Sequence, residues 1–512
     1  MTETQRFAFC AASAPDPTAA AAGRDVLALG GNALEAAIAM AASLTVARPD
    51  LAGLGADATF LVREPGGRLH VIDAIGLTGL NASGEAYRKA DHDILPKRGT
   101  KAQLSVPGAV AGWMIALEMA RAFGGKIPLA DLLAPAITSA REGFTLHVSA
   151  PADAKELADE PGFAETFLDN GNWPEAGTQR HATKLADTLE QLAHAGLGDF
   201  YRGDVGREIA YDLERMRAPL TRADFEKFEA RVRKPLVWRQ GLQTMFAASS
   251  PTLGVGHLVA AALQMRLETS WRHEDAMLHA LLEAGKTALR SGSAFALDPS
   301  CIDIKPESAF EPKTLEAQAT QIARDRAKPL SFTPDIPQAL SIAASDDKGY
   351  VVIATFSMGD AYGAGYVLNR TGLLLNNAGR FFSLDPRAPH TFAPKRKVPF
   401  TPSPLMAVHD EGRILALGSG SIDVDAQILA RITAGQGLAE ALEAPRLRIG
   451  HEVHVRFEDR FDPSSLRGLE KRGHALTAST QNFGAACALQ RHRNGSIEAA
   501  ADPRSAGRVE GF

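Results

Sequence analysis

The spacing of apolar residues changes near residue 335, and this change restricts the folds open to the chain. Before it, apolar residues recur at helical spacing over long segments, as in Ala20–Thr45. The segment Asp298–Gln338 is polar and interrupted by prolines, which predicts a surface linker, with one helix at Thr314–Arg326. After the linker, alternation with a period of two predicts strands at Leu340–Ala344, Tyr350–Phe356, Gly372–Leu375, Leu405–His409, Ile414–Leu417, His454–Phe457 and Ala485–Arg491. The chain is therefore expected to be helix-rich first and strand-rich second.

Two long helices are expected near the N-terminus. A glycine turn at Gly30 and Gly31 separates them, and the second begins near Asn32. The second helix has apolar residues on almost all of its faces, so we expect it to be buried. Further elements are predicted as strands at Thr59–Val62 and Leu69–Ile72, and as helices from Ser105–Gly108 to about Ala122, at Ala130–Arg141, at Ala182–Ala195 and at Val424–Ala434.

The charge balance and the three cysteines narrow the range of functions. The 512 residues carry 55 Lys and Arg against 60 Asp and Glu without a basic block, which argues against nucleic acid or an anionic membrane as the main partner. Cys10, Cys301 and Cys487 form neither a disulfide framework nor a metal knuckle, which favours a reducing compartment. Apolar segments such as Ala36–Ala47 are shorter than the ~20 residues that cross a bilayer, and the N-terminus lacks a secretion signal. We expect a cytoplasmic protein with a small-molecule ligand, and no motif predicts a metal or a cofactor.

Eight segments, in the same order over most of the chain, match one known family. They are GRDVLALGGNALEAAIAMAASLTVARPDLAGLG (Gly23–Gly55), SVPGAVAGW (Ser105–Trp113), LLAPAITSAREGF (Leu132–Phe144), GDFYRGDVGREIA (Gly198–Ala210), TGLLLNN (Thr371–Asn377), LGSGSIDVDAQILARI (Leu417–Ile432), EALEAPRLR (Glu440–Arg448) and the closing FGAACALQ and ADPRSAGRVEGF. Each segment alone is weak evidence. Together, from about residue 8 to the C-terminus, they resemble the γ-glutamyltranspeptidase family.

The resemblance implies an α+β N-terminal-nucleophile (Ntn) hydrolase fold, an αββα sandwich of two stacked antiparallel sheets between helical layers. In that family a precursor cuts itself at the linker, and the freed threonine attacks a γ-glutamyl amide with its own α-amine as the base. Residues 1–332 would correspond to the helix-rich large subunit and residues 333–512 to the strand-rich small subunit. The two regions together would form one domain.

The family's nucleophile motif, T-T-H-[FY]-S before a strand and D-x-x-G, corresponds here to a stretch that begins at Pro337. Proline has no hydroxyl, so neither self-cleavage nor acyl transfer can use the family's route at this residue. Thr333 is an alternative nucleophile, but it would need an insertion before the strand. The sequence therefore predicts a chain that stays whole.

The family's glutamate pocket is also altered. The arginine that holds the substrate carboxylate falls at Ile75, and the acid that grips the substrate ammonium falls at Arg380, which reverses the charge. The S-S-M-S-P motif keeps hydroxyls at Thr401 and Ser403. The oxyanion loop G-S-P-G-G-S becomes Gly418-Ser419-Gly420-Ser421-Ile422-Asp423, whose N–H donors at Ser421 and Ile422 could survive in a loop of changed shape.

Each candidate site residue has a functional and a structural interpretation. Arg380, with Asn376 nearby, could bind an anionic ligand, or it could pair with Asp360 or Asp385. The candidates for handling protons in a converted site are Ser357, Asp360, Tyr362, Ser421 and Asp423. Asp423 and Asp425 could instead cap a helix, and His257 and His390 could be bases or structural residues. The retained glycines of the scaffold favour a preserved fold around a dismantled or converted pocket.

Three functions remain open from the sequence. The first is an enzyme with a converted pocket that acts on a small carboxylate or amide other than glutathione, using Arg380 as the anion holder and Ser419 to Ile422 as donors. The second is a non-catalytic family member that binds a ligand or supports an active paralogue, as a homo-oligomer or with that partner. The third retains family chemistry through Thr333.

Overall fold

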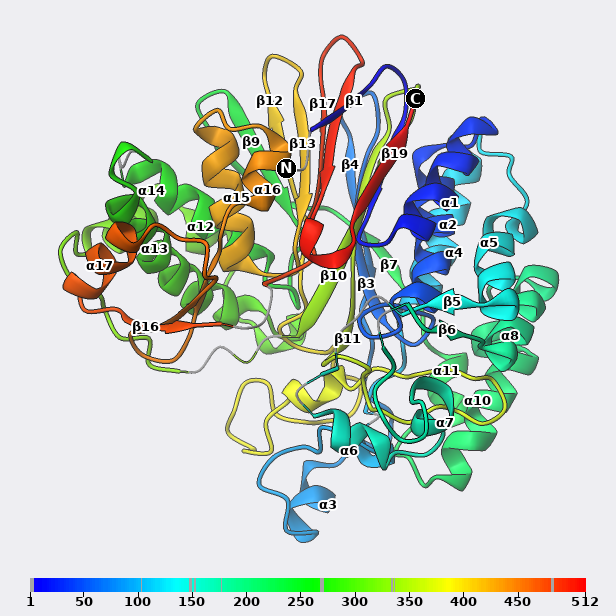
Figure 1. Ribbon diagram of the computed structural model, residues 1–512. Coiled ribbons are helices and arrows are strands. Elements are labelled where there is room, and N and C mark those ends of the chain that lie inside the picture. The colour runs from blue at the N-terminus through cyan, green and yellow to red at the C-terminus, as the bar shows by residue number, and fades with distance from the viewer. Residues whose placement is uncertain are drawn as a thin grey trace.

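Two seven-stranded antiparallel sheets form the centre of the computed structural model (Figure 1). The structure describes residues 4–102, 104–146, 150–151, 153–175, 177–267, 271–332, 335, 337–479 and 483–512. The first sheet has the order β1 (Gln5–Phe7), β18 (Ile497–Ala501), β17 (Cys487–Arg491), β13 (Ile414–Gly418), β12 (Leu405–His409), β9 (Gln243–Ala247) and β8 (Leu236–Gln240). The second has the order β19 (Arg508–Gly511), β2 (Ala11–Ala14), β10 (Gln338–Ser345), β11 (Val351–Gly359), β3 (Asp57–Arg63), β4 (Leu69–Ala74) and β7 (Arg231–Arg233).

Both sheets combine strands from the two sides of the linker. In the second sheet, β10 and β11 lie between β2 and β3, and in the first, β12 pairs with β9. Two smaller sheets lie outside this sandwich: β14 (Leu447–Ile449), β15 (His454–Phe457) and β16 (Ala475–Ala478) form one, and β5 (Phe144–Thr145) and β6 (Gln179–Arg180) form the other.

One helical layer covers the second sheet, on the right of Figure 1. Its main helices are α1 (Pro17–Ala28), α2 (Ala33–Ala47), α4 (Ala109–Ala122), α5 (Leu129–Glu142) and α8 (Thr183–Ala195). Every residue of α2 is buried, as its sequence predicted. Asn32 caps this helix by accepting from the N–H groups of Leu34 and Glu35, while the Glu35 side chain accepts from the Asn32 N–H. This capping box fixes the point where the turn ends and the buried helix begins.

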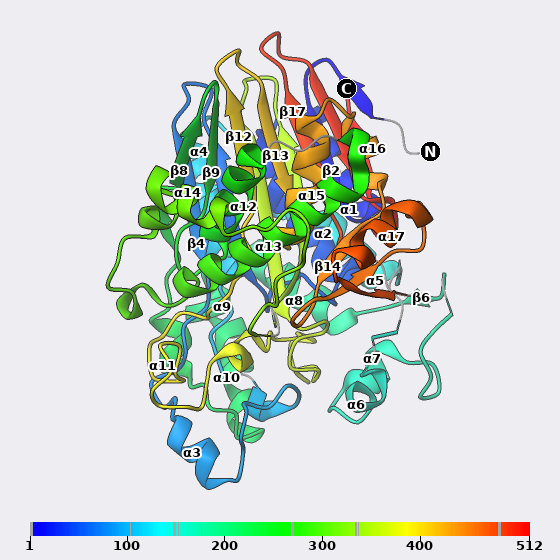
Figure 2. The same cartoon turned by 90° about the vertical axis from the view of Figure 1, so that its left-hand side faces the viewer.

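A second helical layer covers the first sheet and faces the viewer in Figure 2. It contains α12 (Gly254–Arg266), α13 (Glu274–Phe295), α14 (Pro312–Thr320), α15 (Ile422–Thr433), α16 (Leu438–Glu443) and α17 (Pro463–Lys471). Shorter or peripheral helices are α3 (Gly84–Lys89), α6 (Ala154–Ala158), α7 (Phe163–Phe167), α9 (Asp199–Arg202), α10 (Asp204–Arg215) and α11 (Arg222–Glu226). Within the described ranges, none of the helices combines the length and apolar character needed to cross a bilayer.

The space between the sheets is apolar along most of its length and polar toward one end. Ala343, Ile353, Leu61 and Val71 lie in adjacent strands of the second sheet and belong to the core between the two sheets. Two residues closer to the end, the same four strands carry the polar row Ser341, Thr355, Thr59 and Asp73. Since register partners share a face, these polar side chains point into the same inter-sheet space. This end of the sandwich is where the polar site is built.

The predicted elements are confirmed with two exceptions. The expected strand Gly372–Leu375 is wrong: Gly372 has a left-handed φ of +68°, and the only ladder contact described there is an isolated bridge from Leu374 to Val367. The helix expected at Thr314–Arg326 runs from Pro312 to Thr320. Its C-terminal part is shorter: a turn follows at Gln321, and side chains of α13 contact the carbonyls of Ala323 and Lys328 beyond it.

Candidate active site

The N-terminal end of β10 faces the glycine–serine loop, Gly418–Ser421, that precedes α15. A Cβ built on Gly420 would lie 2.6 Å from the Cβ of Ala339, so the side chain of Ala339 points at this loop. Pro337 is buried just before the strand. Beside them, the Ser357 hydroxyl donates to the Gln338 carbonyl at 2.7 Å and accepts from the Gly359 N–H at 3.0 Å. Ser357 is thus fixed by the backbone on both sides.

A nucleophile that used this loop as its oxyanion hole would have to lie on a strand position that faces the loop. A nucleophile and its oxyanion donors must flank the same carbonyl, so the nucleophile must face the loop. In this chain the residue whose side chain meets the loop is Ala339, two residues after Pro337. Neither residue carries a hydroxyl. Thr333, the alternative nucleophile, lies outside the described residues.

The loop itself is closed by its own hydrogen bonds. Gly420 has a φ of +76°, which an alanine or larger residue adopts only with strain. The Ser421 N–H donates to the Ser419 hydroxyl at 3.3 Å, and the Ser421 hydroxyl donates to the Asp423 carboxylate. The Ile422 side chain is buried and packs where α12 passes at Gly256. One of the two expected oxyanion donors is therefore already used within the loop.

Asp423 and Asp425, in the first turn of α15, both have structural partners. Asp423 accepts from the N–H of Ile449 at 3.0 Å and pairs with Arg448 at 3.2 Å, which holds β14 to the helix. Asp425 meets Nε2 of His257 on α12 at 2.9 Å, and both side chains are buried. The sequence had offered these residues separately, and it gave no sign of the pairing across 168 positions.

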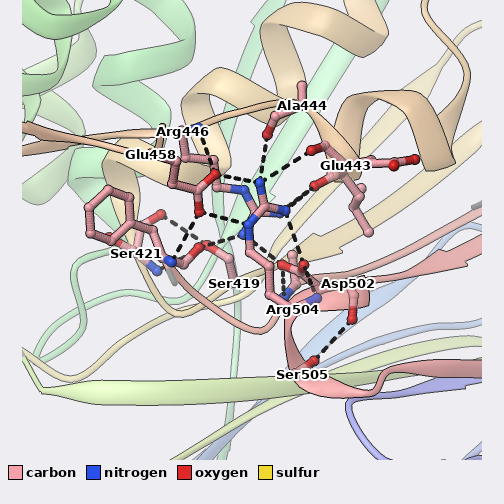
Figure 3. A network of polar contacts seen from close by, with 12 residues as sticks. Ser419, Ser421, Glu443, Ala444, Arg446, Glu458, Asp502, Arg504 and Ser505 are labelled. Carbon is pink, nitrogen blue, oxygen red and sulfur yellow. Dashed lines mark hydrogen bonds and ion pairs between the residues drawn. The ribbon is translucent and has the colours of Figure 1, made fainter. Parts of the chain in front are cut away.

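A buried network of four charged residues supports the back of this loop (Figure 3). Arg504 binds both oxygens of Glu458, at 2.7 and 2.6 Å, and Arg446 pairs with Asp502 at 2.6 Å. Gly484, with a φ of +94°, leaves room where Arg446 approaches Ser419. Although burial disfavours its charged form, hydrogen bonds from Arg504 keep the pKa of Glu458 below its ordinary value. Two cations and two anions balance, so the charges are compensated in the interior.

Arg380 pairs with two carboxylates, those of Asp360 and Asp335. Its Nη2 donates to Asp360 at 2.8 Å, with a second bond from Nε to the same carboxylate. Its Nη1 and Nη2 also donate to the two oxygens of Asp335, at 2.8 and 2.9 Å. Arg380 is 17% exposed and stacks over the ring of Phe381. Of the expected partners, Asp360 is confirmed, and Asp335 takes the place considered for Asp385.

Asn376 and Asn377 join this cluster to the rest of the fold. The Asn376 side chain donates to the Gly55 carbonyl at 2.9 Å and accepts from the Ser105 hydroxyl at 3.2 Å. The Asn377 side chain donates to Asp360 at 2.8 Å and accepts from the Asp360 N–H at 2.9 Å. The amide groups of both residues therefore set the position of the Arg380 cluster.

Ile75, Thr401 and Ser403 contribute packing and backbone contacts. Ile75, which the sequence aligned with the family's arginine, is buried in an apolar cluster with Leu104, Ala378 and other residues. The Ser403 hydroxyl accepts from the Ala248 N–H at 3.1 Å, and the Thr401 hydroxyl donates to the Val398 carbonyl at 3.3 Å. These hydroxyls hold the strand end of the first sheet in place.

Tyr362 lies in an aromatic cluster rather than beside the loop. The rings of Phe163, Phe167 and Trp173 pack against it at centroid distances of 5.3 to 5.6 Å. Its buried hydroxyl has no hydrogen-bond partner among the described residues, and burial raises its pKa well above the ordinary value. The surroundings are those of a core residue, because a phenol that stays protonated and enclosed cannot exchange protons with a ligand.

A buried cluster on α13 was not expected from the sequence. His279 approaches His474 at 2.9 Å and the Ala323 carbonyl at 2.8 Å. Glu283 and Lys286 pair at 2.8 Å, and Lys286 also donates to the Lys328 carbonyl at 2.8 Å. The two imidazoles and the carboxylate offer metal-ligand atoms within 4.8 Å of one another. The adjacent Lys286 ammonium opposes a cation there, and the visible role of the cluster is to hold the backbone of the 323–328 segment.

Comparisons with known proteins show the family to which the chain belongs. The family profile described as gamma-glutamyltranspeptidase matches residues 19–512, so the chain belongs to the γ-glutamyltranspeptidase family. It is 33% identical to the oxamate amidohydrolase proenzyme of Klebsiella pneumoniae, with 98% of each chain covered. It is 27% identical to the glutathione hydrolase proenzyme of Escherichia coli, over 96% of this chain and 89% of that protein.

A solved structure confirms the fold. The cephalosporin acylase from Bacillus halodurans superposes with a TM-score of 0.90 and 26% identity, over 100% of this chain and 97% of that one. The expected α+β Ntn-hydrolase sandwich is therefore confirmed.

Proposed function

We propose that this protein remains one uncleaved chain and binds a small carboxylate, or the amide of one, at the Arg380 cluster without forming an acyl-enzyme. The absence of a hydroxyl at Ala339, where the strand end meets the Gly418–Asp423 loop, is the observation that carries the proposal. Without a nucleophile there, neither self-cleavage nor covalent acyl transfer has an attacking atom.

The hydroxyls around the strand end support the same conclusion. Ser357, Ser403 and Ser421 each donate to a carbonyl or carboxylate of the protein itself. A serine nucleophile needs an adjacent base that can accept its proton, and none of these three is paired with a histidine or a lysine among the contacts of the described residues. The site is therefore better suited to binding than to attack.

The ligand class follows from the way Arg380 is occupied. Its two outer nitrogens bind the two oxygens of Asp335 in a bidentate fork, which is the geometry in which arginine recognises a free carboxylate. Asp335 is 62% exposed, so a ligand carboxylate can compete with it from solvent. The K. pneumoniae relative is named for oxamate, which carries a carboxylate beside an amide. Oxamate is therefore the first compound to test.

Two measurements test the proposal. Intact mass and a denaturing gel of the purified protein should show a single species of 54.4 kDa. Oxamate should raise the melting temperature, and Arg380→Ala should abolish that shift, whereas Lys313→Ala on α14 should retain it. Two fragments, with the smaller beginning at Thr333, would overturn the proposal and revive the third function.

Turnover is the second candidate, and Asp57 is the observation that favours it. This carboxyl lies next to Ser357 in the sheet register, and burial raises its pKa to about 7. A general base with a pKa near neutrality could activate a water molecule for direct hydrolysis of an amide. Ammonia release from oxamate by the wild type, lost in Asp57→Asn, would replace the binding proposal with this one.

The cellular location is part of the proposal. We infer a cytoplasmic protein because Cys10, Cys301 and Cys487 are unpaired, and two of them are buried as thiols. Fractionation of cells that express the chain with its own N-terminus tests this point.

A further inference from the structure

Asp57 begins β3 at the polar end of the second sheet. Its register partner on β11 is Ser357, the residue fixed to the carbonyl just before Ala339. Register partners share a face of the sheet, so the Asp57 carboxyl points into the same space as Ser357. The residue is 2% exposed and was not singled out by the sequence.

One oxygen of Asp57 holds two separate chain segments. Its Oδ1 accepts from the Gly76 N–H at 2.9 Å and from the Gly108 N–H at 3.0 Å. The two segments approach closely: a Cβ on Gly108 would overlap the Ala74 carbonyl, and a Cβ on Gly76 would overlap the Val106 carbonyl. Oδ2 is buried and has no hydrogen-bond partner among the described residues. A single buried acceptor therefore joins the turn after β4 to the turn before α4.

Those two turns are connected to the Arg380 cluster. Ser105, three residues before Gly108, donates to the side chain of Asn376 at 3.2 Å. The next residue, Asn377, donates to the Asp360 carboxylate that binds Arg380. The chain of contacts from Asp57 to Arg380 runs through these hydrogen bonds and two short segments of backbone, Ser105–Gly108 and Asn376–Asn377.

We propose that Asp57 is the positioning residue of the ligand site, because its Oδ1 holds the Gly76 and Gly108 turns and through Ser105 and Asn376 places the Arg380 cluster. The ligand part of this statement rests on the proposed function. The positioning of the two turns does not, and it can be measured without a ligand.

The charges around Asp57 determine its pH dependence. Burial raises its pKa to about 7, while the two N–H donors and Lys397 act in the opposite direction and Asp73 adds to the rise. Arg233 pairs with Asp73 at 2.9 Å, and the buried Tyr201 hydroxyl lies on the α4 side, bonded to the Pro107 carbonyl. An unfolded aspartate titrates near pH ~4, so the folded chain holds this proton more tightly. Stability from this group is therefore present at low pH and is lost as the pH rises toward 7.

The test uses the full chain with Asp57→Asn and Asp57→Ala. Asparagine keeps the accepting oxygen, and alanine removes it. In hydrogen exchange with mass spectrometry, peptides that contain Gly76 and Gly108 should exchange about fivefold faster in Asp57→Ala and at the wild-type rate in Asp57→Asn, since one lost hydrogen bond is worth about 1 kcal/mol. Equal protection of both turns in all three proteins would overturn the proposal.

The pH profile of the melting temperature tests whether the Asp57 carboxyl is the group that titrates. Between pH 5 and pH 8, the melting temperature of the wild type should fall relative to that of Asp57→Asn, whose side chain does not titrate; parallel profiles would overturn the assignment of the charge to Asp57. If the wild type shows no oxamate shift, the proposed function fails, while the exchange experiment still decides the positioning role. If the shift exists, it should persist in Asp57→Asn and disappear in Asp57→Ala.

Discussion

Arg380 holds the carboxylate of Asp335 through two parallel hydrogen bonds, Nη1 to Oδ2 at 2.8 Å and Nη2 to Oδ1 at 2.9 Å. Asp335 belongs to the linker between the two halves of the chain, and Asp360 is the second partner of the same guanidinium. Together the two acids outweigh the one cation by one negative charge. Displacing Asp335 with a ligand carboxylate keeps this balance, because one anion leaves as another arrives.

Removing the charge of Asp335 should therefore strengthen ligand binding. In Asp335→Asn the Arg380 guanidinium keeps its bonds to Asp360, and the Asp335 carboxylate no longer competes with the ligand. A charge-assisted hydrogen bond contributes about 1.5–3 kcal/mol, so we expect the dissociation constant for oxamate to fall about tenfold or more. Isothermal titration calorimetry measures the change. Asp335→Glu serves as the matched control, since it retains a competing carboxylate, and equal affinities in all three proteins would contradict the prediction.

Breaking the buried network behind the loop should destabilise the fold. Arg504→Met leaves Glu458 buried without its bidentate partner, which costs about 3–5 kcal/mol in comparable cases. Urea unfolding measures this loss. The control is Arg460→Met, because Arg460 contacts the same carboxylate at 3.5 Å from a half-exposed position and should change stability by less than about 1 kcal/mol.

The Arg504–Glu458 pair also predicts how the stability of the fold depends on pH. The pKa of Glu458 is lowered in the folded protein, so its contribution is complete above the pKa of an unfolded glutamate and is lost as the pH falls through the folded value. The difference in stability between wild type and Arg504→Met should shrink on acidification below about pH 4. A difference that grows in acid would show that Glu458 is not the charge involved.

Gly55 should tolerate no side chain. A Cβ there would overlap the Leu374 carbonyl, and the Gly55 carbonyl accepts from both the backbone and the side chain of Asn376. We expect Gly55→Ala to lower the unfolding free energy by about 1–3 kcal/mol, the range for overpacking, and to weaken oxamate binding through Asn376. Gly66→Ala is the control, since its Cβ would meet open space in the turn between β3 and β4. Equal stability of both variants would contradict the prediction, because it would show that the backbone near Leu374 can shift without a loss of unfolding free energy.

The α13 cluster should protect the linker from proteolysis. Glu283 and Lys286 hold the backbone of Lys328, and His279 faces the Ala323 carbonyl. The segment contains two trypsin sites, Arg324 and Arg326, because Pro329 follows Lys328 and blocks cleavage there. The double variant Glu283→Gln with Lys286→Met avoids an unpaired buried charge and should be cleaved there several-fold faster than wild type. Lys313→Met, in the exposed part of α14, should be cleaved in the segment at the wild-type rate.

Much of the scaffold was predictable from local patterns. The Asn32 cap, the apolar α2 and the alternating strands each depend on residues close together in the sequence, so local sequence patterns predict them. The Gly372–Leu375 strand failed because its apolar run hides a left-handed glycine. A short apolar segment does not reveal whether a partner strand lies beside it.

The site could not be predicted in the same way, because contacts between distant segments of the chain bring its residues together. The sequence pattern pointed to Pro337, whereas the residue whose side chain meets the loop is Ala339. The register shift between β10 and β11 lies at this point, and no local pattern reveals it. His257 and Asp425, Arg380 and Asp335, and the α13 cluster each join residues from separate elements. Asp57 was missed because it opens an apolar strand and its two donors are backbone groups.

The interleaving of strands from both sides of the linker determines what a cut there could do. Because β10 and β11 are bonded between β2 and β3, and β12 to β9, the segments before and after the linker share both ladders. A nick between them, made by any protease, would leave two polypeptides that elute as one particle and unfold in one transition. The linker is thus a place where covalent continuity can be lost without loss of the architecture.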